Sequence, residues 1–374
     1  MQSALKLWRG YSPPRRGGEA RQPQGWRDGV VRPAGRFRRA DHPVCAIAPL
    51  GASTPPLRGG ECAYLNLILT IALLVWNTSS VFSSQATQNF DNVQIKILPV
   101  QGNIYMAAGA GGNITLQVGK EGVLMVDTEY GPLAPRIVAE IRKLSKGPIR
   151  YIINTHVHPD HVGGNAALAK LIPEDPAAPL RIIAHENVLN RMTKPAGKET
   201  PAPEPGLPTD EYFTPFKDIR FNGEAIIIYH EPHAHTDGDS LVLFRASDVI
   251  SAGDIFTPGA YPFIDLERGG SVEGEIAALN HILGLTVPGH TQDGGTYVIP
   301  GHGRICDEAD VVEYRDMVVI VRDRIREMLK KGMTLEQVKA ARPTRDYDTE
   351  YVSSSSFVTA DRFVESVYRS LVQR

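Results

Sequence analysis

The sequence predicts an α/β protein in which two β-sheets pack face to face and helices cover their outer sides. Residues 93–126 consist of short apolar or alternating runs separated by Gly, which is typical of antiparallel hairpins. Strand-like runs then alternate with amphipathic helices, and residues 308–372 carry mainly helical spacing. This order favours a sandwich of two sheets followed by a helical extension.

The individual elements follow from local patterns. Strands are expected at residues 93–100, 104–107, 114–118, 123–126, 151–153, 180–184, 225–229, 241–244, 249–251 and 297–299. Helices are expected at residues 133–144, 166–172, 272–283, about 308–330, 334–342 and 359–372. The Pro-rich stretch 193–216 has little periodicity and is predicted to be one long loop.

The composition excludes several classes of protein. The chain has 374 residues, of which 42% are hydrophobic and 22% are charged, so a wholly disordered, collagen-like or coiled-coil chain is excluded. Three Cys in this length exclude a disulfide scaffold. The formal net charge of −2 gives no indication of a nucleic-acid partner. Ten of the 11 His follow residue 155, which directs attention to that part of the chain.

Residues 1–60 differ from the rest of the chain. They carry a net charge of +8, are rich in Gly and Pro, and lack an apolar period. Such a segment cannot bury enough apolar surface to offset its ordering entropy. We expect either a disordered basic leader or a start codon assigned too far upstream.

An apolar run of twelve residues, Leu65–Trp76, lies within residues 61–86. It is shorter than the roughly 20 residues of a transmembrane helix and suits the core of a secretory signal peptide. We expect cleavage near Ala86 and a periplasmic or secreted protein without stable membrane insertion. A buried core helix and an uncleaved membrane anchor are the alternatives. Cleavage would leave Cys306 as the single Cys.

A His-rich motif follows the predicted strand 151–153. It reads THVHPDHVGG over residues 155–164 and supplies His156, His158, Asp160 and His161. Imidazoles and carboxylates suit Zn²⁺, and Gly163 with Gly164 permits a close backbone approach. Three further candidate ligands lie at strand ends, where one site could collect them: His235, Asp254 and His302.

Over residues 90–306, these motifs resemble the metallo-β-lactamase superfamily. Five motifs occur in the family's order, namely Asp127, the His156–His161 cluster, His235, Asp254 and His302. The resemblance implies a four-layer αβ/βα sandwich with metals at one edge. It also implies a catalytic domain at 87–306 and a helical extension at 307–374. His235 is preferred to the neighbouring His233 because the pattern His-Thr-Asp-Gly-Asp matches the family motif.

The resemblance further implies two Zn²⁺ ions per chain, although the same donors could take iron or manganese. One ion would be held by His156, His158 and His235. The other would be held by Asp160, His161 and His302. Asp254 would bridge the ions, and Asp127 would orient the His-rich loop. A metal-bridging hydroxide would then attack the substrate, and Asp160 would accept or shuttle the proton.

Four observations narrow the substrate class. Asp254 stands where the better-known zinc β-lactamases have Cys or Ser, which favours a layout similar to glyoxalase II or lactonases. His158 stands where diiron flavoproteins have Glu. Expected export argues against cytoplasmic glutathione-thioester or tRNA substrates. Residues 87–374 carry a net charge of −9, which argues against nucleic acid.

We therefore expect an exported dizinc hydrolase of a small ester, lactone, thioester or amide. The alternatives are a β-lactamase, a mononuclear iron oxidoreductase similar to persulfide dioxygenases, and an inactive metal-binding protein. Residues 193–216 and 256–266 are expected to frame the pocket. Tyr212, Phe213, Tyr261 and Phe263 are the candidate substrate-facing aromatics. The helices after Glu308 could shape the pocket or mediate self-association, so the oligomeric state is left open.

Overall fold

The computed structural model describes residues 89–195, 200–291, 294–352 and 357–373. The expected leader (1–60) and signal peptide (61–86) lie outside the described residues. In the part of the chain that is described, no helix has both the length and the apolar character needed to cross a membrane.

The first sheet has seven strands in the order β1 to β7. They are β1 (Lys96–Gln101), β2 (Ile104–Ala108), β3 (Ile114–Gly119), β4 (Gly122–Val126), β5 (Ile149–Ile153), β6 (Arg181–His185) and β7 (Asp210–Tyr212). Strands β1 to β4 form an antiparallel meander, whereas β4 to β7 pair in parallel. Parallel pairing requires crossover connections, and helices supply them.

The second sheet has five strands in the order β12-β11-β10-β9-β8. They are β8 (Phe216–Phe221), β9 (Glu224–Glu231), β10 (Asp239–Phe244), β11 (Val249–Gly253) and β12 (Tyr297–Pro300). Only β11 and β12 pair in parallel within this sheet. The carboxyl ends of β11 and β12 therefore meet at one edge.

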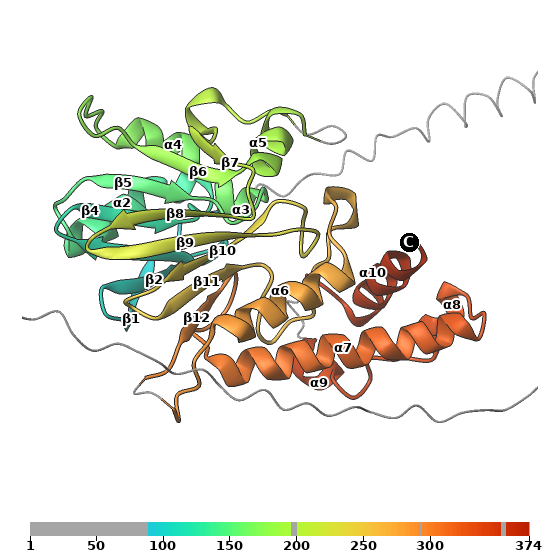
Figure 1. Cartoon of the computed structure of the whole chain (residues 1–374). Coiled ribbons are helices and arrows are strands. Elements are labelled where there is room, and N and C mark those ends of the chain that lie inside the picture. Colours follow the sequence, from blue (N-terminus) through green and yellow to red (C-terminus); the bar gives the residue numbers. More distant parts are fainter. Residues whose placement is uncertain (1–88, 196–199, 292–293, 353–356, 374) are drawn as a thin grey trace, which may run out of the picture. The chain divides into compact units, whose positions relative to one another are not determined.

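The longer helices lie on the outer sides of the two sheets, whereas the short α3 (Pro159–Val162) lies at the strand ends (Figure 1). The helices are α2 (Ala134–Leu144), α3 (Pro159–Val162), α4 (Asn165–Leu171), α5 (Glu186–Thr193), α6 (Val272–Leu285), α7 (Glu308–Lys330), α8 (Leu335–Ala340), α9 (Asp348–Tyr351) and α10 (Ala360–Val372). Short 3₁₀ turns are found at Gly131–Leu133, Glu204–Gly206 and Leu266–Arg268. Side-chain caps fix several helix starts, including the capping boxes of α7 at Asp307 and of α8 at Thr334.

Three apolar cores separate four layers. Successive side chains of strand β4 point into two different cores. Leu124 and Val126 contribute to the core between the sheets, and Val123 and Met125 contribute to the core beneath α2 and α4. The third core joins the outer side of the second sheet to α6, α7 and α10. The predicted four-layer sandwich with C-terminal helices is thus confirmed.

Most predicted elements are found within a few residues of their expected bounds. The prediction of one long loop over residues 193–216 was wrong in part, because β7 (Asp210–Tyr212) pairs with β6 inside it. Strand β8 (Phe216–Phe221) was also not predicted. Strand β7 is three residues long, too short to show a repeating pattern, and its Tyr212 is its one buried residue.

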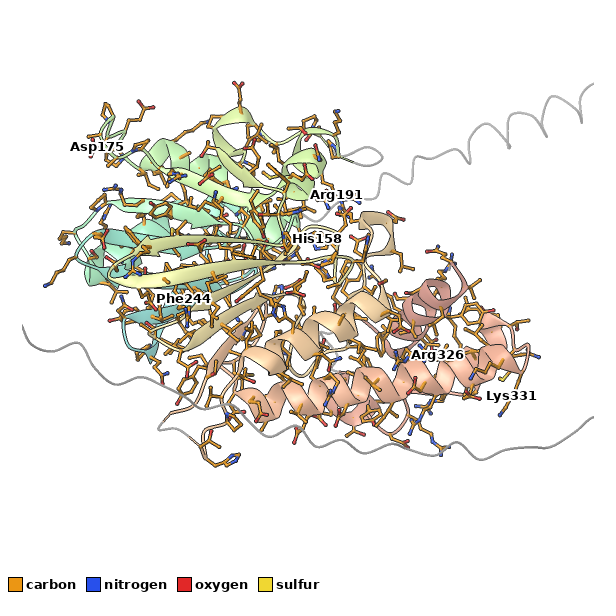
Figure 2. The ribbon with its side chains drawn as sticks, in the orientation of Figure 1. His158, Asp175, Arg191, Phe244, Arg326 and Lys331 are labelled. Carbon is orange, nitrogen blue, oxygen red and sulfur yellow. The ribbon has the colours of Figure 1, made fainter. Side chains whose placement is uncertain are left out.

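The candidate ligands follow strands that end on the same side of the sandwich. Asp127 follows β4, the His-rich motif follows β5, Asp254 follows β11 and His302 lies just past β12. Figure 2 shows His158 at this end of the strands, with Phe244 farther back along the second sheet. Hydrogen bonds join the two sheets here, from Asn113 N to Gly301 O at 2.7 Å and from Ser240 N to Thr155 O at 2.8 Å.

Candidate metal centre

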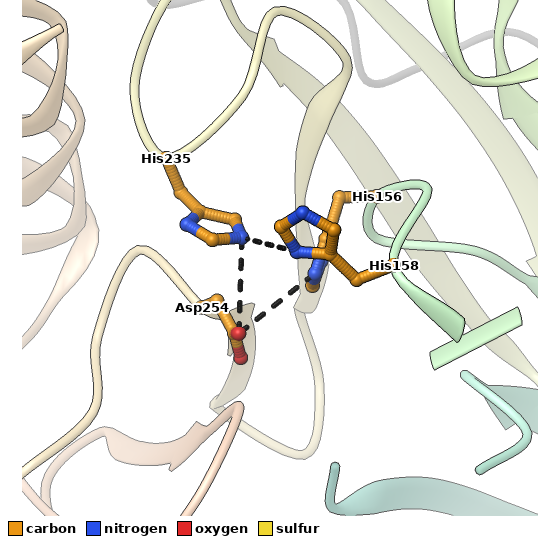
Figure 3. Close-up of side chains that lie close together, drawn as sticks. All are labelled: His156, His158, His235 and Asp254. Atoms are coloured by element: carbon orange, nitrogen blue, oxygen red, sulfur yellow. Dashed lines mark hydrogen bonds and ion pairs between the residues drawn. The ribbon is translucent and has the colours of Figure 1, made fainter. Parts of the chain in front are cut away.

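The first group of side chains consists of His156, His158, His235 and Asp254. One ligand atom from each residue lies within 4.8 Å of every other. Figure 3 shows the three imidazoles and the carboxylate converging on one point. Nε2 of His235 is 2.9 Å from Nδ1 of His158. Oδ2 of Asp254 is 3.8 Å from Nε2 of both His156 and His235.

The second group consists of Asp160, His161 and His302, also within 4.8 Å of one another. Oδ2 of Asp160 is 3.2 Å from Nε2 of His302 and 3.8 Å from Nε2 of His161. Oδ1 of Asp254 is 3.2 Å from Nε2 of His161 and 3.5 Å from Nε2 of His302. The two oxygens of Asp254 therefore face different groups, as expected of a bridging carboxylate.

The structure thus brings together all seven residues proposed as ligands from the sequence. His233 lies outside both groups, because it is exposed and its Nδ1 bonds to the backbone oxygen of Gly269. His185 instead caps helix α5, accepting a hydrogen bond from the backbone N–H of Asn187. Cys306 is buried and also lies outside the groups.

Asp127 is a buried carboxylate that fixes the His-rich loop. Its Oδ1 accepts a hydrogen bond from Thr155 N at 2.8 Å, and its Oδ2 accepts one from Thr155 Oγ1 at 2.7 Å. Oδ2 also lies 2.7 Å from Nδ1 of His161. This bond leaves Nε2 of His161 directed at the cluster. The backbone of Asp127 has φ 66°, a left-handed conformation that turns its side chain away from β4 toward the loop.

The donor atoms fit metal ions. Among the described residues, three buried atoms of the cluster lack a hydrogen-bond partner, namely Nε2 of His156, Nε2 of His161 and Oδ1 of Asp254. The 3.2 Å approach between the last two lacks hydrogen-bond geometry. Buried polar atoms without a partner are rare and call for an explanation. A cation held between neutral imidazoles and a carboxylate would provide one.

The electrostatics of the first group agree with this fit. Burial lowers the pKa of His156 well below 6.5, and the neighbouring imidazoles of His161 and His235 lower it further. Burial likewise lowers the pKa of His235 to about 4, with His158 adding to the shift. Burial alone would raise the pKa of Asp254, but the surrounding imidazoles hold it well below its usual range. Neutral imidazole and ionised carboxylate are the forms that bind metals.

Sequence reasoning missed three residues that support the ligands. Glu129 is buried, and its Oε2 accepts hydrogen bonds from Ala110 N and Gly111 N, which fixes the loop beside His161. Asn113 donates to the backbone oxygens of Pro300 and Gly303, on either side of His302. Asp265 pairs with His158. None of the three belongs to a local motif, because each acts on residues distant in sequence.

Asp265 holds the imidazole of His158 in place. Its Oδ2 is 2.9 Å from Nε2 of His158 and accepts a hydrogen bond from Arg268 Nη1 at 2.9 Å. Burial raises the pKa of Asp265, but these partners hold it below its ordinary value. The bond to Nε2 leaves Nδ1 of His158 for the cluster. A backbone carbonyl does the same for His235, where Phe263 O bonds to Nδ1 at 2.5 Å.

Replacing Asp265 by Ala should weaken metal binding, because His158 would lose the acceptor that fixes its ring. We expect a roughly tenfold to hundredfold loss of affinity at the first group. Competition with a chromophoric chelator would measure it. Asp210→Ala, which removes a partly buried ion pair with Lys217 outside the cluster, is the matched control. Equal affinities for the Asp265→Ala protein and the parent protein would contradict this role.

A cavity of about 610 Å³ opens over the cluster. It is lined by Tyr130, His158, Pro159, Asp160, Asp254, Thr257, Gly259, Ala260, Tyr261, Phe263, His302, Phe357 and Val358. The segment 256–266 therefore frames the cavity as expected, whereas described residues of 193–216 do not line it. Of the four candidate aromatics, Tyr261 and Phe263 line it. Tyr212 is buried against Ser240 and Phe213 faces solvent elsewhere.

Comparison with known proteins decides the family. A model of the metallo-beta-lactamase superfamily matches residues 108–302, which include all seven residues of the cluster. The chain belongs to the metallo-beta-lactamase superfamily. The resemblance inferred from the motifs is thereby confirmed.

Individual relatives of this superfamily member are distant. A linear primary-alkylsulfatase of Pseudomonas sp. is 37% identical over 73 residues, which is 19% of this chain and 14% of the relative. The structure of a stereoselective inverting sec-alkylsulfatase from Pseudomonas sp. aligns with a TM-score of 0.56 at 17% identity, covering 74% of this chain and 50% of the other. A metallo-beta-lactamase from Pontibacter korlensis aligns with a TM-score of 0.48 at 14% identity, covering 60% and 99%. This chain thus spans half or less of the two sulfatases.

Proposed function

We propose that this chain is a hydrolase that binds two Zn²⁺ ions and cleaves a small ester, lactone, thioester or amide. The observation that carries the proposal is the position of Asp254, whose two oxygens face two separate sets of donors. Zn²⁺ bound there would supply Lewis acidity, lowering the pKa of a coordinated water towards about 7 and polarising a substrate oxygen.

The chain's own residues would orient the substrate and move protons. Asp160 lines the cavity, and burial alone would raise its pKa, but the bond to His302 and the charges of His161 and His302 together lower it. The carboxylate is therefore ionised at neutral pH and can accept a proton at Oδ2. Tyr130 also lines the cavity, and burial together with Asp160 raises its pKa. Its hydroxyl keeps its proton and can donate a hydrogen bond to a substrate oxygen.

The cavity favours carboxylic esters and their relatives over β-lactams. Among the described residues that line it, none is Lys or Arg. β-Lactams carry a carboxylate beside the ring, and a site selecting them would gain from a fixed cation. A β-lactamase is one alternative to this proposal. A mononuclear iron oxidoreductase is another, because it would use the same donors.

Sulfate esters form a second candidate class, favoured by the 37% identity to a linear primary-alkylsulfatase over 73 residues. A sulfate ester would place its charge near the metals, so it would not need a cation in the cavity wall. We also propose export to the periplasm or the medium, on the strength of the apolar run Leu65–Trp76.

A hydrolysis screen with metal analysis of the same sample tests the proposal. The substrates are p-nitrophenyl acetate, a lactone, a thioester, a cephalosporin and p-nitrophenyl sulfate. We expect about two Zn per chain and turnover of the acetate, the lactone or the thioester. Rapid loss of the cephalosporin alone would favour a β-lactamase, and turnover of the sulfate alone would favour a sulfatase. A content of one Fe per chain would contradict the proposal of a zinc hydrolase.

A further inference from the structure

The wall of the cavity opposite the His-rich loop comes from the C-terminal part of the chain. Phe357 and Val358 precede α10 and line the cavity together with Phe263. Phe357 is 68% exposed, the second-largest exposure among the large apolar side chains described as exposed. An exposed aromatic ring at the mouth of a reaction cavity suggests contact with a ligand.

Phe357 is held in place by aromatic and cationic contacts. Its ring lies edge-to-face with Phe263, with centroids 5.3 Å apart and an interplanar angle of 85°. The guanidinium of Arg362 lies 4.2 Å from the Phe357 ring centroid and 4.8 Å from that of Phe263. Cation–π contacts of this kind stabilise a ring in one position without burying it.

These contacts connect the exposed ring to the metal centre. Phe263 stacks on the imidazole of His158, with centroids 5.7 Å apart, and its backbone oxygen bonds to His235. The aromatic surface therefore continues from a candidate metal ligand to the cavity mouth. A substrate whose reacting bond lies over the metals would extend along this surface.

The chemistry of the wall defines the group that it would accept. Phe263, Phe357 and Val358 offer apolar surface, and no Lys or Arg lines the cavity among the described residues. Arg362 is not among the residues that line the cavity, and its guanidinium lies against the two phenyl rings. The wall therefore suits an uncharged apolar group better than an anionic one.

We propose that Phe357 is a specificity-determining residue that receives an uncharged apolar arm of the substrate, and that Arg362 is the positioning residue that holds it. The inference rests on the proposed ester hydrolysis for its kinetic test. It adds that the C-terminal extension selects the substrate, whereas the motifs at 127–302 supply the metal centre.

Kinetics with p-nitrophenyl acetate and p-nitrophenyl octanoate test the proposal. Phe357→Ala should lower the octanoate-to-acetate ratio of kcat/KM roughly tenfold, mainly through a higher KM for octanoate. Arg362→Met should lower the same ratio, and Arg362→Lys, which keeps a cation over the rings, should restore part of it. Phe213→Ala removes an equally exposed ring away from the cavity and should leave the ratio unchanged.

Binding to the metal-free protein separates this proposal from the proposed reaction. Octanamide and acetamide are uncharged probes whose affinities can be followed by ligand-observed NMR. Phe357→Ala should weaken octanamide binding roughly fivefold or more relative to acetamide. If the wild-type protein hydrolyses neither ester, ester hydrolysis fails, and the binding result alone decides the role of Phe357. Equal ratios and equal octanamide affinities for Phe357→Ala and Phe213→Ala would overturn the proposal.

Discussion

Asp254→Ala is expected to lower turnover by about three orders of magnitude or more and to reduce the metal content of the protein. The carboxylate lies between Nε2 of His161 at 3.2 Å and Nε2 of His156 at 3.8 Å. Its removal takes away the one negative charge that both groups share. Steady-state kinetics and elemental analysis on the same preparation would measure the two effects.

A loss of fold must be separated from this loss of function. Glu224 is another buried carboxylate, bonded to Gln117 and Ser247 at a distance from the cluster. Glu224→Gln should reduce the free energy of unfolding and keep both the metals and the turnover of the folded fraction. Asp254→Ala should retain its circular dichroism spectrum and gain little thermal stability from added Zn²⁺. Unchanged turnover for Asp254→Ala would mean that the bridge has been misassigned.

The sequence was sufficient to predict those strands and metal ligands that are marked by a local pattern of residues. All five residues of β4 (Gly122–Val126) are buried, so the strand reads as a continuous apolar run. The His-rich motif places four donors within six residues, directly after a buried strand. His235, Asp254 and His302 could be identified because each lies beside a strand end, where a sandwich collects side chains at one edge.

Long-range partners could not be read from the sequence. Asp265 is 107 residues from His158, and its role depends on a hydrogen bond that only the fold brings about. Phe357 lies in the C-terminal extension, yet it lines the cavity beside His158. Tyr212 was one of the candidates to face substrate, but β7 turns it inward to bond with Ser240. In each case tertiary packing, and not local pattern, determines the position of the side chain.

Gly112 is one of the Gly residues that the sequence indicated only as separators of hairpin strands, and the structure gives it a second role. Gly112 lies against His161, and a Cβ at this position would overlap the atoms of the imidazole ring. Its backbone N–H also donates to Asp160 O at 3.1 Å. Gly112 therefore provides the space that lets two residues of the second group, Asp160 and His161, lie next to the loop at 109–113.

Gly112→Ala is accordingly expected to displace the His161 ring. The ring is fully buried and bonded to Asp127, so it cannot move without losing that bond or shifting the loop. We expect a cost of about 1–3 kcal/mol in the free energy of unfolding and a fall in turnover of roughly a hundredfold. The metal content should fall from about two ions to one, because the atoms nearest to a Cβ at Gly112 all belong to His161 and none to His156, His158 or His235.

Gly284→Ala is the matched control, since no atom lies within 4 Å of a Cβ at that position in α6. It should keep both metals and raise stability by about 0.5–1 kcal/mol, because Ala is the better helix former. Denaturant titration and elemental analysis of both variants make the comparison. If Gly112→Ala kept two ions and full turnover, the space at Gly112 would not be needed for the second metal group. If it lost both ions, the two groups would bind metal as one cooperative unit, with Asp254 as the element they share.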